Sequence, residues 1–205
     1  MKYLFFLCLL WSPSPYAKKY GQNYQKAIAF LQQHQSLLEQ TAKELAIEPA
    51  ALKAVVFPEL LRYNQLKDML ETEALEQAYL RGLAVDFSIG PFQMKPSFAQ
   101  TLEDSLDLAI DRSPKARLAR LKTLEGQIFY LKCFLQICQK EKCPPNWSPL
   151  ELWSCKYNSG LNKSLEELSY WRQQKAFPYG PKLSPDIQDN YSDIALDYYQ
   201  QFGPK

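Results

Sequence analysis

The 205-residue sequence has little glycine, a single histidine and no marked excess of charge of either sign. Seven glycines are few for a turn-rich all-β domain, so we expect a mainly helical fold. The 24 basic and 22 acidic residues give a formal net charge of +2, which provides no basic field of the kind that attracts nucleic acid. The only histidine, His34, is far from the cysteines and no Cys-x-x-Cys pair occurs, so we expect no zinc site, no other metal and no cofactor.

Long apolar runs are also scarce, and the one at the N-terminus is short. Residues 1–17 contain an early lysine, an apolar run from Tyr3 to Trp11 and a Ser/Pro-rich piece that ends in Ala17, a pattern typical of a secretory signal peptide. The run is shorter than the roughly 20 residues that a membrane-spanning helix needs. We therefore expect a periplasmic or secreted monomer without stable membrane insertion, in which residues 18–205 form a single domain.

Removal of such a signal leaves four cysteines, Cys133, Cys138, Cys143 and Cys155. An even number of cysteines in an oxidising compartment is typical of disulfide bonds, so we expect two of them. Four cysteines allow three pairings, and the sequence leaves all three open.

Apolar residues recur at helical spacing along most of the chain, which predicts a series of amphipathic helices. The DFSIGPFQM stretch, residues 86–94, interrupts this pattern and is expected to be a loop or a short strand. The length and apolarity of residues 114–140 suggest the central buried helix. The expected helices cover residues 24–46, 49–64, 66–83, 97–110, 114–140, 148–160 and 164–173, and a last helix that begins at Ser184 and Pro185.

One carboxyl group stands out in the second expected helix. Glu59 shares a helical face with Val55 and Val56, so its side chain is expected to point into the protein. A desolvated carboxyl group has a raised pKa and holds its proton near neutral pH, which suits a general acid. Arg62 is the one cation at helical spacing from it. The alternative is a glutamate that turns out to the solvent at a kink caused by Pro58.

Short motifs accompany Glu59 in a fixed order. Residues 47–59 open with Ile-Glu-Pro and end in Glu59, residues 90–99 read GPFQMKPSFA, residues 157–160 read YNSG, and Tyr191 follows. Together they resemble the soluble lytic transglycosylase family of the lysozyme superfamily. That family has a catalytic helix that ends in Glu-Ser, then Gly-Leu-Met-Gln-x-Met-Pro-x-x-Ala, Tyr-Asn-Ala-Gly and a late tyrosine.

The resemblance covers residues 47–191 and implies a mainly α, lysozyme-like catalytic domain. It implies an enzyme that cleaves the β-1,4 bond between N-acetylmuramic acid and N-acetylglucosamine of peptidoglycan glycan strands without water, and that leaves 1,6-anhydromuramic ends. Glu59 is then the catalytic residue, first as acid and then as base, and Tyr157 is expected to hydrogen-bond to it. The implied substrate-binding residues are Ser88, Phe92, Gln93, Tyr157, Asn158 and Tyr191, with Phe92 and Tyr191 as a stacking surface.

The sequence departs from the family pattern next to the glutamate. Leu60 replaces the usual serine, Pro58 precedes Glu59, and Pro91 and Phe92 replace Leu-Met. These substitutions favour a divergent member, and they leave open a non-catalytic protein that only binds glycans.

A second carboxyl group would change the chemistry, because glycoside hydrolases usually employ two. Asp86 lies just upstream of the GPFQ motif, so a muramidase that uses Glu59 and Asp86 is a further alternative. Glu71 and Glu73 are other possible partners.

Two kinds of side chain that often serve functional sites are expected to be structural here. His34 lies on the apolar stripe of the 24–46 helix, where a packed histidine is more common than a catalytic one. Trp147, Trp153 and Trp171 are expected in the core rather than as platforms for a sugar ring.

Overall fold

The computed structural model describes residues 14–83, 85–178 and 188–204. These residues form eleven α-helices and two isolated β-bridges, so the expected mainly α fold is confirmed. Residues 1–13, most of the expected signal peptide, lie outside the described residues. None of the described helices is both long enough and apolar enough to cross a lipid bilayer.

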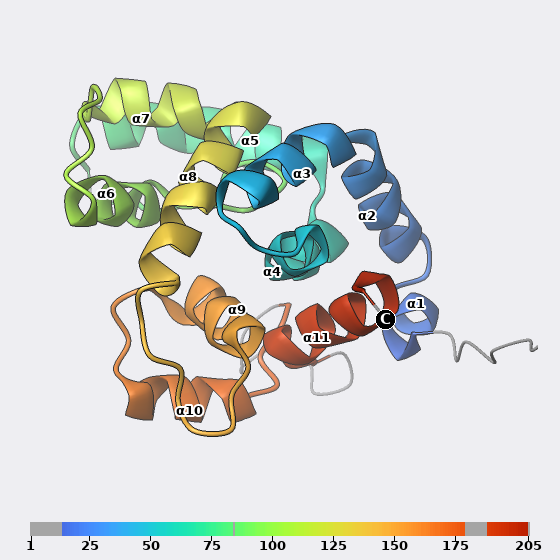
Figure 1. Cartoon of the computed structure of the whole chain (residues 1–205). Helices are drawn as coiled ribbons and strands as arrows, with labels where there is room; N and C mark the ends of the chain where they lie inside the picture. The colour runs from blue at the N-terminus through green and yellow to red at the C-terminus, as the bar shows by residue number, and fades with distance from the viewer. Residues whose placement is uncertain (1–13, 84, 179–187, 205) are drawn as a thin grey trace, which may run out of the picture.

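The helices follow one another in the order coloured in Figure 1. The N-terminal part contains α1 (Pro15–Tyr20), α2 (Gln22–Gln33), α3 (Gln35–Glu44) and α4 (Pro49–Arg62). The middle contains α5 (Gln65–Leu80), α6 (Pro96–Ser105), α7 (Pro114–Leu121) and α8 (Leu124–Cys138). The C-terminal part contains α9 (Pro149–Ser159), α10 (Leu165–Gln173) and α11 (Tyr191–Phe202).

Helix α4 is the central element, although the expectation favoured residues 114–140. It packs against α2, α3, α9 and α11, and it is seen nearly end-on in the middle of Figure 1. From Ala50 to Leu61 every residue except Lys53 is buried, as expected of a helix that is enclosed on all sides. Pro49 occupies the first turn, where its missing N–H costs no hydrogen bond, and the helix continues through Pro58.

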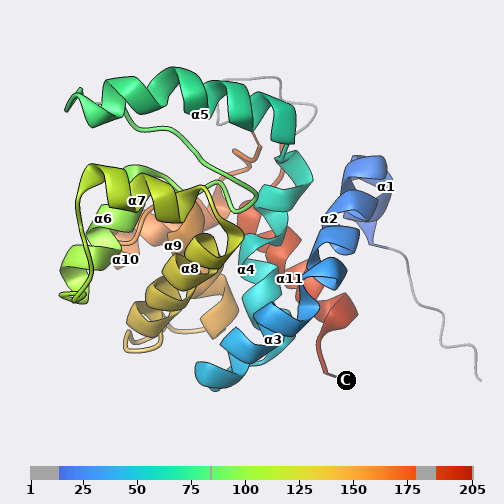
Figure 2. The same cartoon turned by 90° about the horizontal axis from the view of Figure 1, so that it is seen from above.

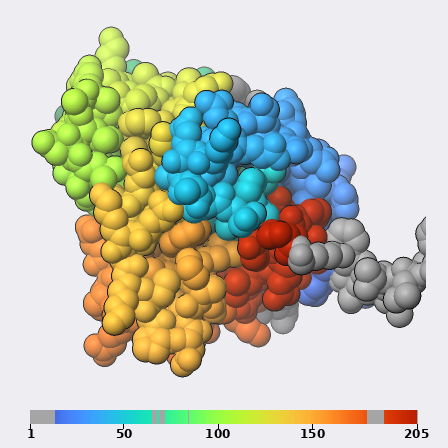
Figure 3. Space-filling model, in the orientation of Figure 1, coloured from blue at the N-terminus to red at the C-terminus, as the bar shows by residue number. Residues whose placement is uncertain are grey.

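The two ends of the described chain close around α4. Figure 3 shows the N-terminal helices, in blue, next to α11, in red, on the same face of the molecule. The hydroxyl group of Ser14, which caps α1, donates a hydrogen bond of 2.6 Å to the carboxylate of Asp197 in α11. Helix α5 lies along one edge of the molecule, as the view from above in Figure 2 shows.

The expected helix over residues 114–140 is wrong as a single element, because the chain turns between α7 and α8. Thr123 has an extended conformation there, and its side chain accepts a hydrogen bond of 3.1 Å from the backbone N–H of Gly126. A Cβ atom at Gly126 would approach the carbonyl oxygen of Arg120 to 2.0 Å, so this close turn requires glycine. A local cap therefore ends one helix and starts another although the apolar spacing continues.

The expected helix over residues 24–46 is also divided, at His34, into α2 and α3. The imidazole of His34 is half-buried and packs against Phe30, with 4.6 Å between the ring centroids. This packing agrees with the structural role expected for His34.

The last helix begins at Tyr191, later than expected. Asn190 caps it, and the same side chain donates hydrogen bonds to the backbone carbonyl groups of Arg172 at 2.6 Å and Gln174 at 2.9 Å. One asparagine thus ties the end of α10 to the start of α11. Residues 184–185, the expected start, lie outside the described residues.

The structure differs from the expectation of two disulfides, because all four described cysteines are free thiols. Cys133 and Cys138 lie five residues apart on α8, about 140° apart around the helix axis, and so do not face each other. The thiol of Cys155 on α9 is buried and donates to the carbonyl oxygen of Leu168 at 3.4 Å. Cys143 is half-buried in the loop that follows α8.

A buried ionic cluster joins α6, α7 and α8. Glu103 is fully buried, and its carboxylate accepts hydrogen bonds from Arg117, Arg120 and Tyr130. Burial by itself raises the pKa of Glu103, but the hydrogen bonds from Arg117, Tyr130 and Arg120 outweigh it and lower the pKa below its usual value. The cluster therefore depends on an ionised carboxylate.

Candidate active site

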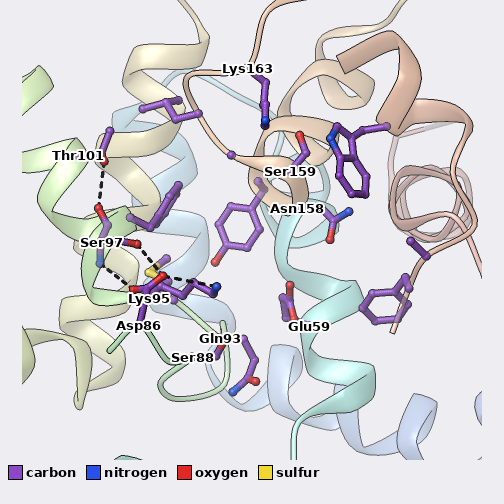
Figure 4. A pocket seen from close by; sticks show the side chains of 18 of the residues that line it. Glu59, Asp86, Ser88, Gln93, Lys95, Ser97, Thr101, Asn158, Ser159 and Lys163 are labelled. Carbon is purple, nitrogen blue, oxygen red and sulfur yellow. Dashed lines mark hydrogen bonds and ion pairs between the residues drawn. The ribbon is translucent and has the colours of Figure 1, made fainter. Parts of the chain in front are cut away.

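A cleft of about 860 Å³ opens beside the C-terminal end of α4. Its walls come from α4, the loop before α6, the first turns of α6, the end of α9 with the loop that follows, and α10. Figure 4 shows Asp86 and Lys95 on one side, Glu59 on the other, and Asn158 and Lys163 farther along the same space. A cavity of this size lies within the roughly 300–1,000 Å³ of ordinary ligand sites. It is the candidate active site.

Glu59 lines this cleft from α4, as its helical spacing predicted. Its side chain is only 7% exposed, so the carboxyl group is largely removed from water. Burial raises the pKa of Glu59, and the positive charge of Arg62 opposes this effect without reversing it. The carboxyl group therefore holds a proton at higher pH than an exposed glutamate does.

Arg62 is the direct partner of this carboxyl group. Its Nε–H donates to Oε2 of Glu59 across one turn of α4, and its side chain also lines the cleft. A second, longer contact of 3.4 Å joins Nη1 of Arg62 to the carbonyl oxygen of Pro178. The spacing in the sequence indicated this cation. It did not indicate that Arg62, rather than Tyr157, would donate the hydrogen bond to Glu59.

Tyr157 and Tyr191 lie close enough to Glu59 for its charge to act on both phenols. The expected hydrogen bond from Tyr157 to Glu59 is absent from the structure, because the Tyr157 hydroxyl group donates to the carbonyl oxygen of Phe92 at 2.8 Å. Tyr191 donates to the carbonyl oxygen of Val55, one helical turn before Glu59, at 2.9 Å. Burial, and then the charge of Glu59, raises the pKa of both phenols well above the ordinary value, so both hydroxyl groups remain neutral donors.

The GPFQ motif forms a tight turn closed by the bridge between Ile89 and Met94. Gly90 has a φ of 68°, and a Cβ atom there would meet Nε2 of Gln127 at 1.7 Å, so this position requires glycine. The buried side chain of Gln127 donates to Ile89 O at 3.0 Å and accepts from the N–H of Phe92 at 2.9 Å. The turn is thus held from inside the protein.

Gln93 lines the cleft as expected, but the protein occupies its donor group. The amide nitrogen of Gln93 donates to Gly90 O at 2.8 Å and to Oδ1 of Asp68 at 3.0 Å. Asp68, on α5, also accepts from the backbone N–H of Gly90 at 2.9 Å. Only the side-chain oxygen of Gln93 is therefore available to a ligand, and it can accept but not donate.

The predicted stacking surface is wrong. Phe92 is fully buried and packs against Phe30, and Tyr191 is 3% exposed; neither lines the cleft. Both rings support the site from behind. Trp171 of α10, which was expected in the core, is half-buried and does line the cleft, whereas Trp153 is buried as expected.

Ser88 and Asn158, two of the predicted substrate-binding residues, line the cleft and offer it neutral polar groups. Ser88 is half-buried, and Asn158 is exposed at the end of α9. The cations Lys95 and Lys163 also line the space, but each has a carboxylate partner within 4 Å. The cleft surface is thus mixed polar and aromatic, which suits a hydroxyl-rich ligand.

Asp86 also lines the cleft, and its side chain is 38% exposed. Its carboxylate accepts from the N–H of Ser97 at 3.2 Å and from the Ser97 hydroxyl group at 2.9 Å, in the first turn of α6. Lys95 lies 3.5 Å from the same carboxylate. Asp86 is therefore a helix cap as well as a cleft residue.

Glu73, another possible second carboxyl group, is exposed outside the cleft, and the side chain of Glu71 is not among the described side chains.

The cleft brings together residues that are far apart in the sequence: Glu59, Ser88, Gln93, Tyr157 and Asn158. It contains one buried carboxyl group that can exchange a proton, paired with the guanidinium group of Arg62. Within the described chain no group of three or more His, Cys, Asp or Glu side chains could hold a metal ion. Comparison of the chain with models of known families, with curated proteins and with solved structures found no match.

Proposed function

We propose that the protein is a lytic transglycosylase with a lysozyme-like catalytic domain that acts on peptidoglycan glycan strands. One observation carries the proposal: the three motifs that resemble this family, represented by Glu59, Gln93 and Tyr157, line a single cleft. Chance motifs scattered over nearly 100 residues have no reason to converge. A periplasmic or secreted location, as residues 1–17 predict, would place the protein with this substrate.

The proposed reaction needs only Glu59 as an acid and base. The protonated carboxyl group donates its proton to the glycosidic oxygen, the bond from C1 of the muramic acid to that oxygen breaks, and positive charge develops at C1. The resulting carboxylate then accepts the proton of the C6 hydroxyl group as O6 forms a bond to C1. The carboxyl group is restored and no water is consumed.

The surroundings of Glu59 support this role. Burial favours the protonated form that the first step requires, and the nearby phenols of Tyr157 and Tyr191 add no negative charge. Ser88, Asn158 and the side-chain oxygen of Gln93 provide hydrogen bonds for sugar hydroxyl and acetamido groups. Trp171 provides the aromatic surface that was expected of Phe92.

A muramidase is the second candidate, because Asp86 lies across the cleft from Glu59 in Figure 4 and keeps part of its carboxylate exposed. Such an enzyme would use Asp86 to stabilise the developing charge or to activate water. A protein that binds glycans without cleaving them is the third candidate, motivated by the pairing of Glu59 with Arg62.

Analysis of reaction products distinguishes these candidates. Purified peptidoglycan is digested with the protein, and mass spectrometry then identifies the new chain ends. We expect 1,6-anhydromuramic ends; reducing ends would support the muramidase, and no new ends would support a binding protein. Glu59→Gln should lower the rate at least about 100-fold, because glutamine has no proton to donate. Glu73→Gln, an exposed position outside the cleft, is the matched control and should keep the full rate.

A further inference from the structure

The contact between Arg62 and Glu59 is at odds with the use of Glu59 as an acid. The guanidinium group cannot give up its proton in a protein, so its presence favours the ionised carboxylate. An acid catalyst needs the opposite state. Separation of the two groups when a substrate binds removes this opposing effect and favours the protonated carboxyl group further.

Arg62 is placed so that a ligand can reach it. Its side chain is 30% exposed, compared with 7% for Glu59, and it lines the cleft. Nε is used by Glu59 and Nη1 has only the long contact with Pro178, whereas Nη2 has no hydrogen-bond acceptor among the described residues. A guanidinium group with unused donors at a cleft surface is suited to a planar, two-oxygen acceptor such as a carboxylate.

Among the charged groups around the cleft, Arg62 is the one suited to bind a carboxylate of the ligand. Among the described residues, the titratable groups that interact electrostatically with Glu59, besides Arg62, are the phenols of Tyr157 and Tyr191, and burial keeps both neutral.

The remaining cleft charges form pairs of their own. Lys95 is paired with Asp86, and Lys163 with Glu167 in an ion pair of 2.6 Å. Each of these lysines therefore already has a carboxylate partner, with which an incoming anion would have to compete.

We propose that Arg62 determines substrate specificity by exchanging the carboxylate of Glu59 for a carboxylate of the glycan strand. The inference rests on the proposed function and deepens it: the preferred substrate carries free carboxylate groups, such as the lactyl group of muramic acid. In the exchange, the ion pair between Arg62 and Glu59 breaks, an ion pair between Arg62 and the ligand forms, and Glu59 takes up one proton from the solvent. Binding of the substrate thereby creates the acid that the reaction needs.

Two disaccharides test this inference, because neither contains the bond from N-acetylmuramic acid to N-acetylglucosamine that the proposed reaction cleaves. The first is N-acetylglucosaminyl-β-1,4-N-acetylmuramic acid, which carries one lactyl carboxylate. The second is di-N-acetylchitobiose, which lacks the lactyl group. Isothermal titration calorimetry at pH 7, in buffers that differ in ionisation enthalpy, measures both the affinity and the number of protons taken up.

For the unmodified protein we expect the muramyl disaccharide to bind at least about tenfold more tightly, as truncation of charge-assisted pairs suggests, and with proton uptake. Chitobiose should bind without proton uptake. Arg62→Gln should lose the preference and the uptake. Glu59→Gln should keep or increase the preference, because Arg62 has no competing partner, but should take up no proton.

Lys132→Gln is the matched control, since it removes a cation of similar exposure that lies outside the cleft and is also paired with a carboxylate, that of Glu44. It should retain the proton uptake. Arg62→Lys keeps a charge without the two-pronged geometry, so it should retain part of the preference, and circular dichroism of each variant verifies the fold.

Equal affinity of the two disaccharides, an undiminished preference in Arg62→Gln, or binding of the muramyl disaccharide without proton uptake would each overturn the inference. So would a failure of both disaccharides to bind. The proposed function is judged separately by the chain ends released from peptidoglycan: anhydro ends together with equal affinities would leave the function standing and remove only the role of Arg62.

Discussion

Gln127 of α8 should be a stabilising residue of the candidate site although it does not line the cleft. Its side chain is completely buried and makes three hydrogen bonds to the backbone: to Ile89 O at 3.0 Å, to Leu121 O at 2.7 Å and from Phe92 N–H at 2.9 Å. Two of these hold the GPFQ turn, and the third holds the end of α7. Replacement by methionine keeps the length of the side chain and removes all three bonds.

The expected loss follows from those three backbone groups. Each hydrogen bond contributes about 1 kcal/mol net, and a buried group left without a partner costs about 1–3 kcal/mol. Methionine regains part of this by burying an apolar side chain. We expect Gln127→Met to lower the free energy of unfolding by about 3–5 kcal/mol, which for a domain of this size corresponds to a melting temperature lower by roughly 6–20 °C.

Urea unfolding at 25 °C, followed by circular dichroism, measures this loss directly. Gln136→Met is the matched control on the same helix, because Gln136 is half-buried and no described residue is hydrogen-bonded to its side chain. It should change the free energy of unfolding by no more than about 0.5 kcal/mol. If Gln127→Met were no more destabilising than Gln136→Met, the argument that Gln127 secures the turn of Gly90 and Gln93 would be refuted.

Three further predictions concern the cleft and the ionic cluster. Asp86→Asn should keep more than about one third of the peptidoglycan-cleaving rate, because asparagine can still cap α6 and the proposed reaction needs no second carboxyl group; a loss as large as that of Glu59→Gln would favour the muramidase. Trp171→Ala should raise KM about 2- to 12-fold with little change in kcat, as expected for the loss of an aromatic contact that binds substrate; an unchanged KM would exclude Trp171 as a sugar-binding surface. Glu103 has a lowered pKa in the folded protein, so its stabilising effect is present above its unfolded pKa of about 4.3 and is lost as the pH falls through the folded value. Urea midpoints between pH 7 and pH 3 should therefore fall more steeply in the unmodified protein than in Glu103→Gln, and equal slopes would contradict the ionised state of this carboxyl group.

Local signals in the sequence predicted the helix starts well. Ser148 and Glu151 form a capping box at the start of the helix expected over residues 148–160, with hydrogen bonds of 3.2 Å from Glu151 N–H to the Ser148 hydroxyl and 2.8 Å from Ser148 N–H to the Glu151 carboxylate. Pro49 opens α4 in the same predictable way. Such signals succeed because both partners lie within one helical turn.

The divisions at His34 and Thr123 escaped prediction, because apolar residues continue at helical spacing on both sides of them. At Thr123 a local cap and the close turn at Gly126 divide the helix, and the continuing apolar spacing conceals this signal. The same limit applies to the exposure of aromatic residues. Phe92 and Trp171 differ in the structure by the elements that cover them, and the spacing of motifs contains no information about such cover.

The sequence by itself determined the helical class, the helix that carries Glu59, and the inward direction of that side chain, since each depends on residues less than two helical turns apart. It also contained the spacing of Glu59 and Arg62 on one helix face, from which their ion pair could have been expected. Only the tertiary structure decided that Asp68 holds a turn 22 residues away, that Tyr157 bonds to Phe92 rather than to Glu59, and that Trp171 lines the cleft. These contacts join separate helices, and their energies are set by burial and by which partners packing brings within hydrogen-bond distance.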